Sequence, residues 1–314
     1  MMRLRVVRNT LLEEKSIKNM EKKVLDIHAD DYALSPNSDK DILNLCKLGK
    51  LDSISIIPNL DIFQNSVSQF ITEKQNFPKE INVSVHLNVM EGKCCADKDS
   101  LPDLVNEQGL FTVSWGKLFI WNYIPWKKNK IKLQLKKEIS AQIKKCIDSG
   151  IIKADKIRID SHQHPHMIPL FFDSIIEVLE EENLQAEYIR NTQDPLSFYF
   201  MSGGFKDISI SNVIKCILLN HFSNHVKKII KKKQLPVSYL CGVFFSGKMD
   251  TRIEKYIPVF IKNSNKNNYI TELLFHPGLM HSEEINYEFT KAGFNNFHLS
   301  ENRTIEYKEV LKYE

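Results

Sequence analysis

The chain has 314 residues, of which 42% are hydrophobic and 26% are charged, as in an ordinary folded globular protein. Its formal charge is only +4, from 43 basic and 39 acidic side chains, so the composition gives no sign of nucleic-acid binding. The sequence has no run of 18 apolar residues and no secretory leader pattern. We therefore expect no stable membrane insertion and a cytoplasmic location.

Short apolar runs alternate with helical patterns from about residue 23 onward, and residues 1–22 form an extension of unknown role. Strands are predicted at 23–31, 52–59, 81–88, 156–160, 186–190, 238–247 and 269–278. Helices are predicted at about 37–48, with a cap at Asn37 or Ser38, at 62–71, 131–149 and 170–182, and on the surface at 224–233. Residues 90–128 look like a loop-rich insertion. Alternating βα units of this kind predict an α/β fold with a mainly parallel sheet or barrel, in one domain over residues 23–314.

Polar residues follow four of the predicted strands. Asp30 and Asp31 end the first strand, His86 ends the third, the stretch from Asp160 follows the fourth, and His276 ends the last. Because the carboxyl ends of parallel strands meet on one rim, where active sites lie, we expect these side chains to lie close together.

The adjacent acids Asp30 and Asp31 should point to opposite sides of their strand, so their roles should differ. One carboxylate can bind a metal while the other serves as a general base for water. The alternative is an acid pair at the start of a helix, where carboxylates interact favourably with the helix dipole.

Three histidines, His162, His164 and His166, follow Asp160 within six residues. An extended backbone would place all three on one face, a helix would pair the first with the last, and Pro165 favours the extended path. At most one or two of them can bind a single metal, and Asp160 could orient an imidazole. One aspartate and two histidines leave positions open for water and substrate, as a hydrolytic metal requires.

The sequence contains none of the motifs GxGxxG, GxxxxGK[ST] or GxSxG, so nucleotide binding and serine-hydrolase chemistry have little support. Arg158 and Arg190 are the arginines near the relevant strands, where a metal-dependent phosphoesterase would need them. A glycan-binding relative without activity is a further alternative. The three tryptophans of the insertion could stack on sugar rings or fill the core equally well, and they are Trp115, Trp121 and Trp126.

Four motifs together resemble the YdjC-like carbohydrate deacetylases, which include the chitooligosaccharide deacetylases. They are "ADDYALS" (Ala29–Ser35), "HLNVMEG" (His86–Gly92), "DSHQHPHMIP" (Asp160–Pro169) and "HPG" (His276–Gly278). The sequence departs from the family pattern at Ala33, Met90 and Pro165, and these positions bear on substrate fit more than on metal binding.

The resemblance implies a distorted (β/α) barrel-like fold and hydrolysis of the N-acetyl group of an amino sugar or oligosaccharide. It implies one divalent metal, with Zn, Mg, Mn, Co and Ni as candidates, bound by Asp31, His86 and His162. Asp30 would be the general base and His276 the acid. The resemblance does not identify the sugar. It also leaves the oligomeric state open, and a homodimer is one possibility.

Overall fold

The computed structural model describes residues 25–200 and 209–313, and the expected extension 1–22 lies outside them. Seven strands form one sheet in the order β5-β4-β3-β2-β1-β7-β6, and each neighbouring pair is parallel. The strands are β1 (Leu25–Tyr32), β2 (Ser53–Ile56), β3 (Asn82–Leu87), β4 (Ile157–Ser161), β5 (Ala186–Ile189), β6 (Ser238–Cys241) and β7 (Ile270–Phe275). In the described residues β5 and β6 do not pair, so the sheet curls into a half-barrel, and the predicted parallel, distorted barrel-like fold is confirmed.

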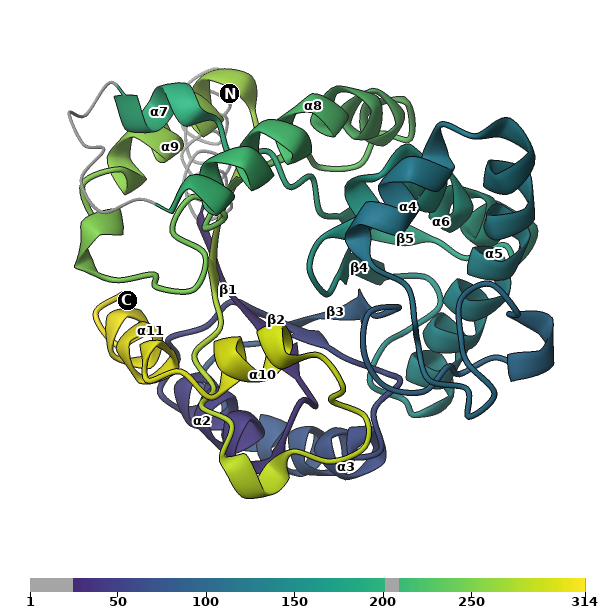
Figure 1. Ribbon diagram of the computed structural model, residues 1–314. Helices are drawn as coiled ribbons and strands as arrows, with labels where there is room; N and C mark the ends of the chain where they lie inside the picture. Colours follow the sequence, from purple (N-terminus) through teal and green to yellow (C-terminus); the bar gives the residue numbers. More distant parts are fainter. Residues whose placement is uncertain (1–24, 201–208, 314) are drawn as a thin grey trace, which may run out of the picture.

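Ten α-helices accompany the sheet within the described residues, and several of them lie around its outside (Figure 1). They are α2 (Pro36–Lys47), α3 (Phe63–Glu73), α4 (Trp115–Asn122), α5 (Pro125–Asp148), α6 (Pro169–Glu181), α7 (Leu196–Phe200), α8 (Ile210–Lys232), α9 (Ile257–Asn267), α10 (Ala292–His298) and α11 (Asn302–Val310). None of these helices is long and apolar enough to cross a bilayer.

The central strand β1 is buried along almost its whole length, because it pairs with β2 on one side and β7 on the other. The long helix α5 packs by the apolar face that its sequence predicts, with Leu135, Ile139 and Ile143 buried. Helix α8 ends in the lysine-rich segment 224–233. There Val226 and Ile230 are buried and Lys228 is exposed, which confirms the predicted surface helix.

One local prediction was wrong, and another was only partly right. The cap of α2 is Ser35, whose Oγ accepts the Ser38 N–H at 3.3 Å, and not Asn37 or Ser38. Pro36 lacks an N–H and has the backbone angle of a first helical residue, so the helix begins earlier than expected. The insertion 90–128 is not all loop, because α4 and the start of α5 occupy its second half. Ser114 caps α4 and Pro125 begins α5 by the same principles.

Candidate active site

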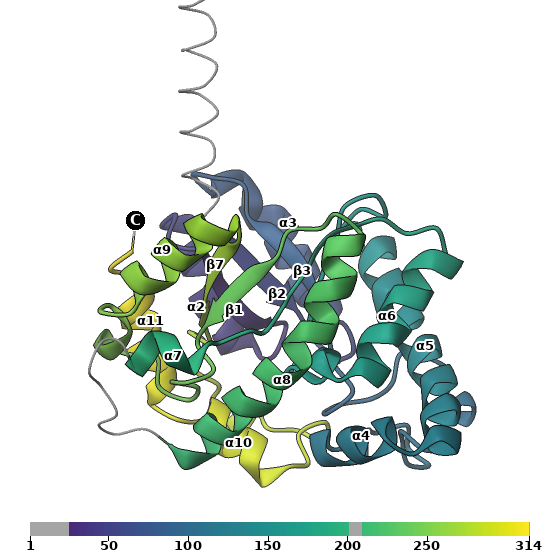
Figure 2. The same cartoon turned by 90° about the horizontal axis from the view of Figure 1, so that it is seen from above.

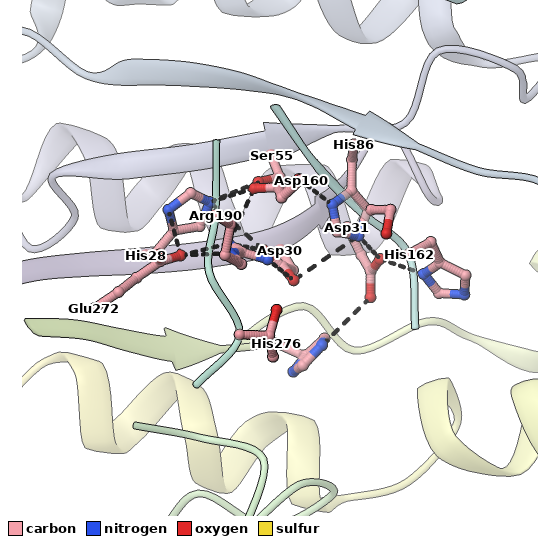
Figure 3. Close-up of polar contacts among 12 residues, drawn as sticks. His28, Asp30, Asp31, Ser55, His86, Asp160, His162, Arg190, Glu272 and His276 are labelled. Carbon is pink, nitrogen blue, oxygen red and sulfur yellow. Dashed lines mark hydrogen bonds and ion pairs between the residues drawn. The ribbon is translucent and has the colours of Figure 1, made fainter. Parts of the chain in front are cut away.

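The five predicted site residues come together at the carboxyl ends of the strands (Figure 3). Asp30 and Asp31 lie at the end of β1 and His86 lies in β3. His162 follows β4 and His276 follows β7. His86 is directly opposite Asp160 in the pairing of β3 with β4. The expectation that these strand ends share a rim is therefore confirmed.

The end of β1 is irregular, and this irregularity separates the two acids. The pairing with β2 shifts register between Ala29 and Tyr32, and Asp31 has a left-handed backbone with φ 66°. Asp30 consequently contacts Arg190, while Asp31 contacts the histidines. The acid pair precedes the capping residue of α2 by several residues, so the helix-start alternative does not describe it.

Asp31, His86 and His162 form a compact group of metal-binding atoms. The Nδ1 atom of His162 lies 2.8 Å and the Nε2 atom of His86 lies 3.2 Å from Oδ1 of Asp31. One donor atom from each of the three residues lies within 4.8 Å of the others. Ligands bound at ~2.0–2.2 Å in tetrahedral or octahedral geometry are ~3–3.5 Å apart. The second carboxylate oxygen of Asp31 is buried and has no hydrogen bond to any residue that the structure describes. The group therefore fits a small divalent cation.

Asp160 orients one of the two imidazoles. Its Oδ1 atom lies 2.6 Å from Nδ1 of His86, and its Oδ2 atom accepts a hydrogen bond from Ser55 Oγ at 2.5 Å. Because a carboxylate only accepts hydrogen bonds, Nδ1 of His86 carries a proton in this contact, and Nε2 is directed toward Asp31. A carboxylate that holds a histidine in this way is the usual support of a metal ligand.

Arg190 binds the other acid of the pair and is fully buried. Its guanidinium donates to both oxygens of Asp30, at 2.9 and 2.8 Å, and its Nε donates to Glu272 Oε1 at 2.7 Å. Its Nη2 atom lies 3.1 Å from Asp160 Oδ2. His28, Asp30 and Asp160 also lie close enough to hold a cation. Arg190 already supplies positive charge to both carboxylates of this second group, which disfavours a further cation there.

The buried charges at the rim favour a cation in the first group. Burial by itself would raise the pKa of Asp30, but the charges of Arg190 and His86 outweigh burial and lower it. Burial would lower the pKa of His86, whereas Asp30 and Asp160 raise it to about 10. For Asp31, contact with His162 outweighs burial and holds the pKa well below the usual range. The buried carboxylates at the rim thus carry more negative charge than Arg190 alone can neutralise.

His276 occupies the edge of the site, in the segment that directly follows β7. Its backbone N–H donates to Glu306 Oε2 at 2.6 Å, and its Nε2 atom lies 3.9 Å from Asp31 Oδ2. Gly278 packs so closely on α2 that an added Cβ would lie 2.0 Å from Ser38 Oγ. The glycine of the "HPG" motif therefore allows this segment to approach the helix.

The extended path predicted for the three clustered histidines was wrong. Gln163 and His164 both have left-handed backbones, and a 3₁₀ turn covers Pro165–Met167. The left-handed pair reverses the chain and carries His166 away from the metal-binding group. His166 instead contacts Ser161 Oγ and the carbonyl of Arg190, and His164 lines the cavity described next.

A cavity of about 550 Å³ opens beside these groups, and Asp30, Asp31, His162 and His276 line it. Sequence reasoning did not include several residues of the site. They are His28, Arg190 and Glu272 in the buried network, and Glu91, Lys215 and His298 on the cavity wall. Glu272 could have been found from the sequence, because it is a charged residue within an otherwise apolar predicted strand. Nothing local marked His298, whose Nε2 lies 3.6 Å from Asp31 Oδ2.

The three tryptophans of the insertion differ in whether they could stack on a sugar or fill the core. Trp115 lines the cavity and stacks on Phe119, with ring centroids 5.7 Å apart. Trp121 packs partly buried against the core under Lys127. Trp126 is 78% exposed. Only Trp115 is therefore placed to contact a molecule in the cavity.

Fold and site together define a parallel α/β half-barrel with an Asp–His–His group at its carboxyl rim. The family described as "YdjC-like protein" matches residues 24–312, and the chain belongs to this family.

Several curated relatives carry the name carbohydrate deacetylase. The Xenopus laevis protein is 27% identical over 159 residues, which are 50% of this chain and 48% of that protein. The Thermoanaerobacter pseudethanolicus protein is 27% identical over 163 residues, 52% of this chain and 59% of its own length. The matched region thus spans about half the length of these relatives. A solved structure from Enterococcus faecalis, described as a candidate cellobiose-phosphate cleavage protein, covers 92% of this chain and 94% of its own. Its identity is 15% and its TM-score is 0.44.

Proposed function

We propose that this protein is a metal-dependent carbohydrate deacetylase that removes the N-acetyl group from an amino sugar or oligosaccharide. The observation that carries the proposal is the Asp31–His86–His162 group beside the Asp30–Arg190 pair at one cavity. Membership of the YdjC-like family and the curated relatives named carbohydrate deacetylase support it.

Asp31, His86 and His162 would hold the metal. Two imidazole nitrogens and a carboxylate suit Zn, Co, Ni or Mn, and suit Mg less well. A divalent metal held there supplies Lewis-acid polarisation of the acetamide carbonyl and makes water a stronger acid.

Asp30 would be the general base for the attacking water. The Arg190 fork leaves each carboxylate oxygen with a free lone pair, fixes its direction, and keeps the group ionised by lowering its pKa. An ionised, oriented carboxylate at the cavity wall can take a proton as soon as water attacks the carbonyl.

His276 would donate a proton to the departing amine, without which the C–N bond breaks poorly. Its ring lies at the edge of the cavity, 16% exposed, with Nδ1 3.8 Å from Glu306 Oε2. The carboxylate of Glu306 also accepts the backbone N–H of His276, so it positions both ends of the residue.

The arginines that a phosphoesterase would need are already engaged. Arg190 binds three carboxylates, and Arg158 pairs with Asp26 at 3.2 Å. The guanidinium of Arg190 is saturated by carboxylates, and Arg158 does not line the cavity of the site.

The test combines metal analysis with acetate release from a panel of N-acetylated sugars. We expect one divalent metal per chain and metal-dependent release of acetate. A metal-loaded protein that releases phosphate from phosphate esters but no acetate would contradict the proposal. A protein that binds the sugars without acetate release would be a glycan-binding relative.

A further inference from the structure

Glu91 is a buried acid on the cavity wall, and within the described residues its carboxylate has only loose contacts with the Lys291 ammonium and the Thr290 amide. The residue is 1% exposed, and neither Oε1 nor Oε2 has a hydrogen bond of good geometry. The nearest cation is Lys291, whose Nζ lies 3.6 Å from Oε1. Buried polar groups are almost always well hydrogen-bonded, so a buried carboxylate that makes only these loose contacts at a cavity has acceptor capacity left for a ligand.

The backbone of Glu91, in contrast, is firmly held. Its carbonyl accepts hydrogen bonds from the side-chain amides of Asn59 at 2.8 Å and Asn88 at 3.0 Å. Its N–H donates to Asn88 Oδ1 at 3.1 Å. Gly92 follows with φ +76°, and a Cβ there would lie 2.6 Å from Leu60 Cδ2. The motif "HLNVMEG" therefore supplies the imidazole of His86 to the metal-binding group and the carboxylate of Glu91 to the cavity wall.

Lys291 links the Glu91 loop to the two segments that flank it. Its ammonium donates to the carbonyls of Met90 and Val113, just before α4, and Lys291 itself directly precedes α10. Figure 2 shows α4 and α10 on the same side of the molecule. Trp115, in the first turn of α4, and Phe294 of α10 line the same cavity. An acid, a cation and flat aromatic surfaces thus surround one space, the combination that holds a sugar ring by its hydroxyls and its C–H face.

We propose that Glu91 is a specificity-determining residue that accepts hydrogen bonds from two neighbouring ring hydroxyls of the amino sugar, with Lys291 donating to one of them. The inference rests on the proposed deacetylase function and adds the ligand chemistry of this wall. The substrate class is an N-acetylated pyranoside with two adjacent free hydroxyls. Burial raises the pKa of Glu91 to about 7, since Lys291 and the Thr290 amide offset it only in part, and hydroxyl donors would stabilise the ionised form.

Glu91→Gln and Glu138→Gln separate recognition from structure. Glu138 is also buried, but its carboxylate accepts the backbone N–H groups of Cys95 and Ala96 and has no place in the cavity wall. Glu138→Gln should lower the melting temperature and leave sugar binding unchanged. Glu91→Gln should keep the metal content and change the melting temperature little, because the glutamine oxygen can still accept from Lys291 or the Thr290 amide.

Binding is measured by calorimetry with N-acetylglucosamine, on metal-loaded protein that carries Asp30→Asn to prevent turnover. Adding Glu91→Gln should weaken binding about 10- to 100-fold, the usual loss for hydrogen bonds to a charged group. The 3-deoxy, 4-deoxy and 6-deoxy analogues then identify the hydroxyls. Two of these analogues, which lack neighbouring hydroxyls, should each bind more weakly than N-acetylglucosamine to protein that retains Glu91. In the Glu91→Gln variant the same analogues should bind about as well as N-acetylglucosamine, because the carboxylate that the hydroxyls would contact is already gone.

The outcomes separate this inference from the proposed function. Sugar binding that does not depend on Glu91 overturns the inference alone. Glu91-dependent binding, with no acetate release by metal-loaded native protein on any N-acetylated sugar, overturns the deacetylase proposal alone. Absence of binding by every N-acetylated sugar of the panel overturns both.

Discussion

Replacing Asp160 by asparagine tests whether the metal-binding group depends on the carboxylate behind it. Asp160 contacts His86 at 2.6 Å, Ser55 at 2.5 Å and Arg190 at 3.1 Å. The side-chain oxygen of an asparagine can still accept a hydrogen bond from Nδ1–H of His86, so the imidazole keeps its orientation. The substitution removes the negative charge that makes the imidazole a stronger ligand.

The loss of metal affinity should be large enough to measure. Outer partners of metal-binding histidines typically change affinity about 10- to 100-fold, which corresponds to about 1.4–2.7 kcal/mol. The amide nitrogen of the asparagine would face the Arg190 guanidinium, donor against donor, so about 1–3 kcal/mol of stability should also be lost. Arg190 keeps its two bonds to Asp30 and its bond to Glu272, so we expect the fold to survive.

The assay is zinc titration of metal-free protein in competition with a coloured chelator, below the melting transition of both proteins. Asp173→Asn is the matched control, because Asp173 contacts His225 at 2.7 Å in a half-exposed pair outside the cavity lining. Unchanged zinc affinity in Asp160→Asn would refute the supporting role of Asp160. An equal loss in both variants would show that the effect is not specific to the site.

Four further substitutions test the assigned roles. His86→Ala combined with His162→Ala should abolish stoichiometric metal binding in elemental analysis, and retained metal would remove both residues from the ligand set. Asp30→Asn should keep the metal and lower turnover about 10²–10⁴-fold, the usual effect of losing a general base, and a near-normal rate would exclude that role. His276→Ala should keep metal content and melting temperature while acetate release falls sharply; lost metal would make it a ligand instead. Gly278→Ala should lower the unfolding free energy by about 1–3 kcal/mol through overpacking against Ser38. Gly116→Ala in α4 is the control, because an added Cβ there would lie 4.0 Å from Ser114 Oγ, and it should leave the unfolding free energy unchanged or raise it.

Local patterns in the sequence determined most of the secondary structure. Strand β1 and helix α5 follow from residue spacing alone, because a buried strand and an amphipathic helix each impose their own period on the apolar residues. The four polar strand ends followed from the same reading, since parallel strands deliver their carboxyl ends to one rim. The weak points were helix starts at proline, where the choice between neighbouring caps depends on backbone angles that apolar spacing does not reveal.

Only the tertiary structure decided which polar residues act together. The chain reverses at Gln163 and His164, which have left-handed backbones, so of the three clustered histidines His162 joins the metal-binding group. No periodic pattern in the sequence encodes such a reversal. Arg190, after β5, joins Asp30 of β1 to Glu272 of β7, and Glu91 meets Lys291 from an equally distant segment. Such contacts depend on the order of strands in the sheet and on long-range packing, because side chains that meet in space need no regular spacing in the sequence.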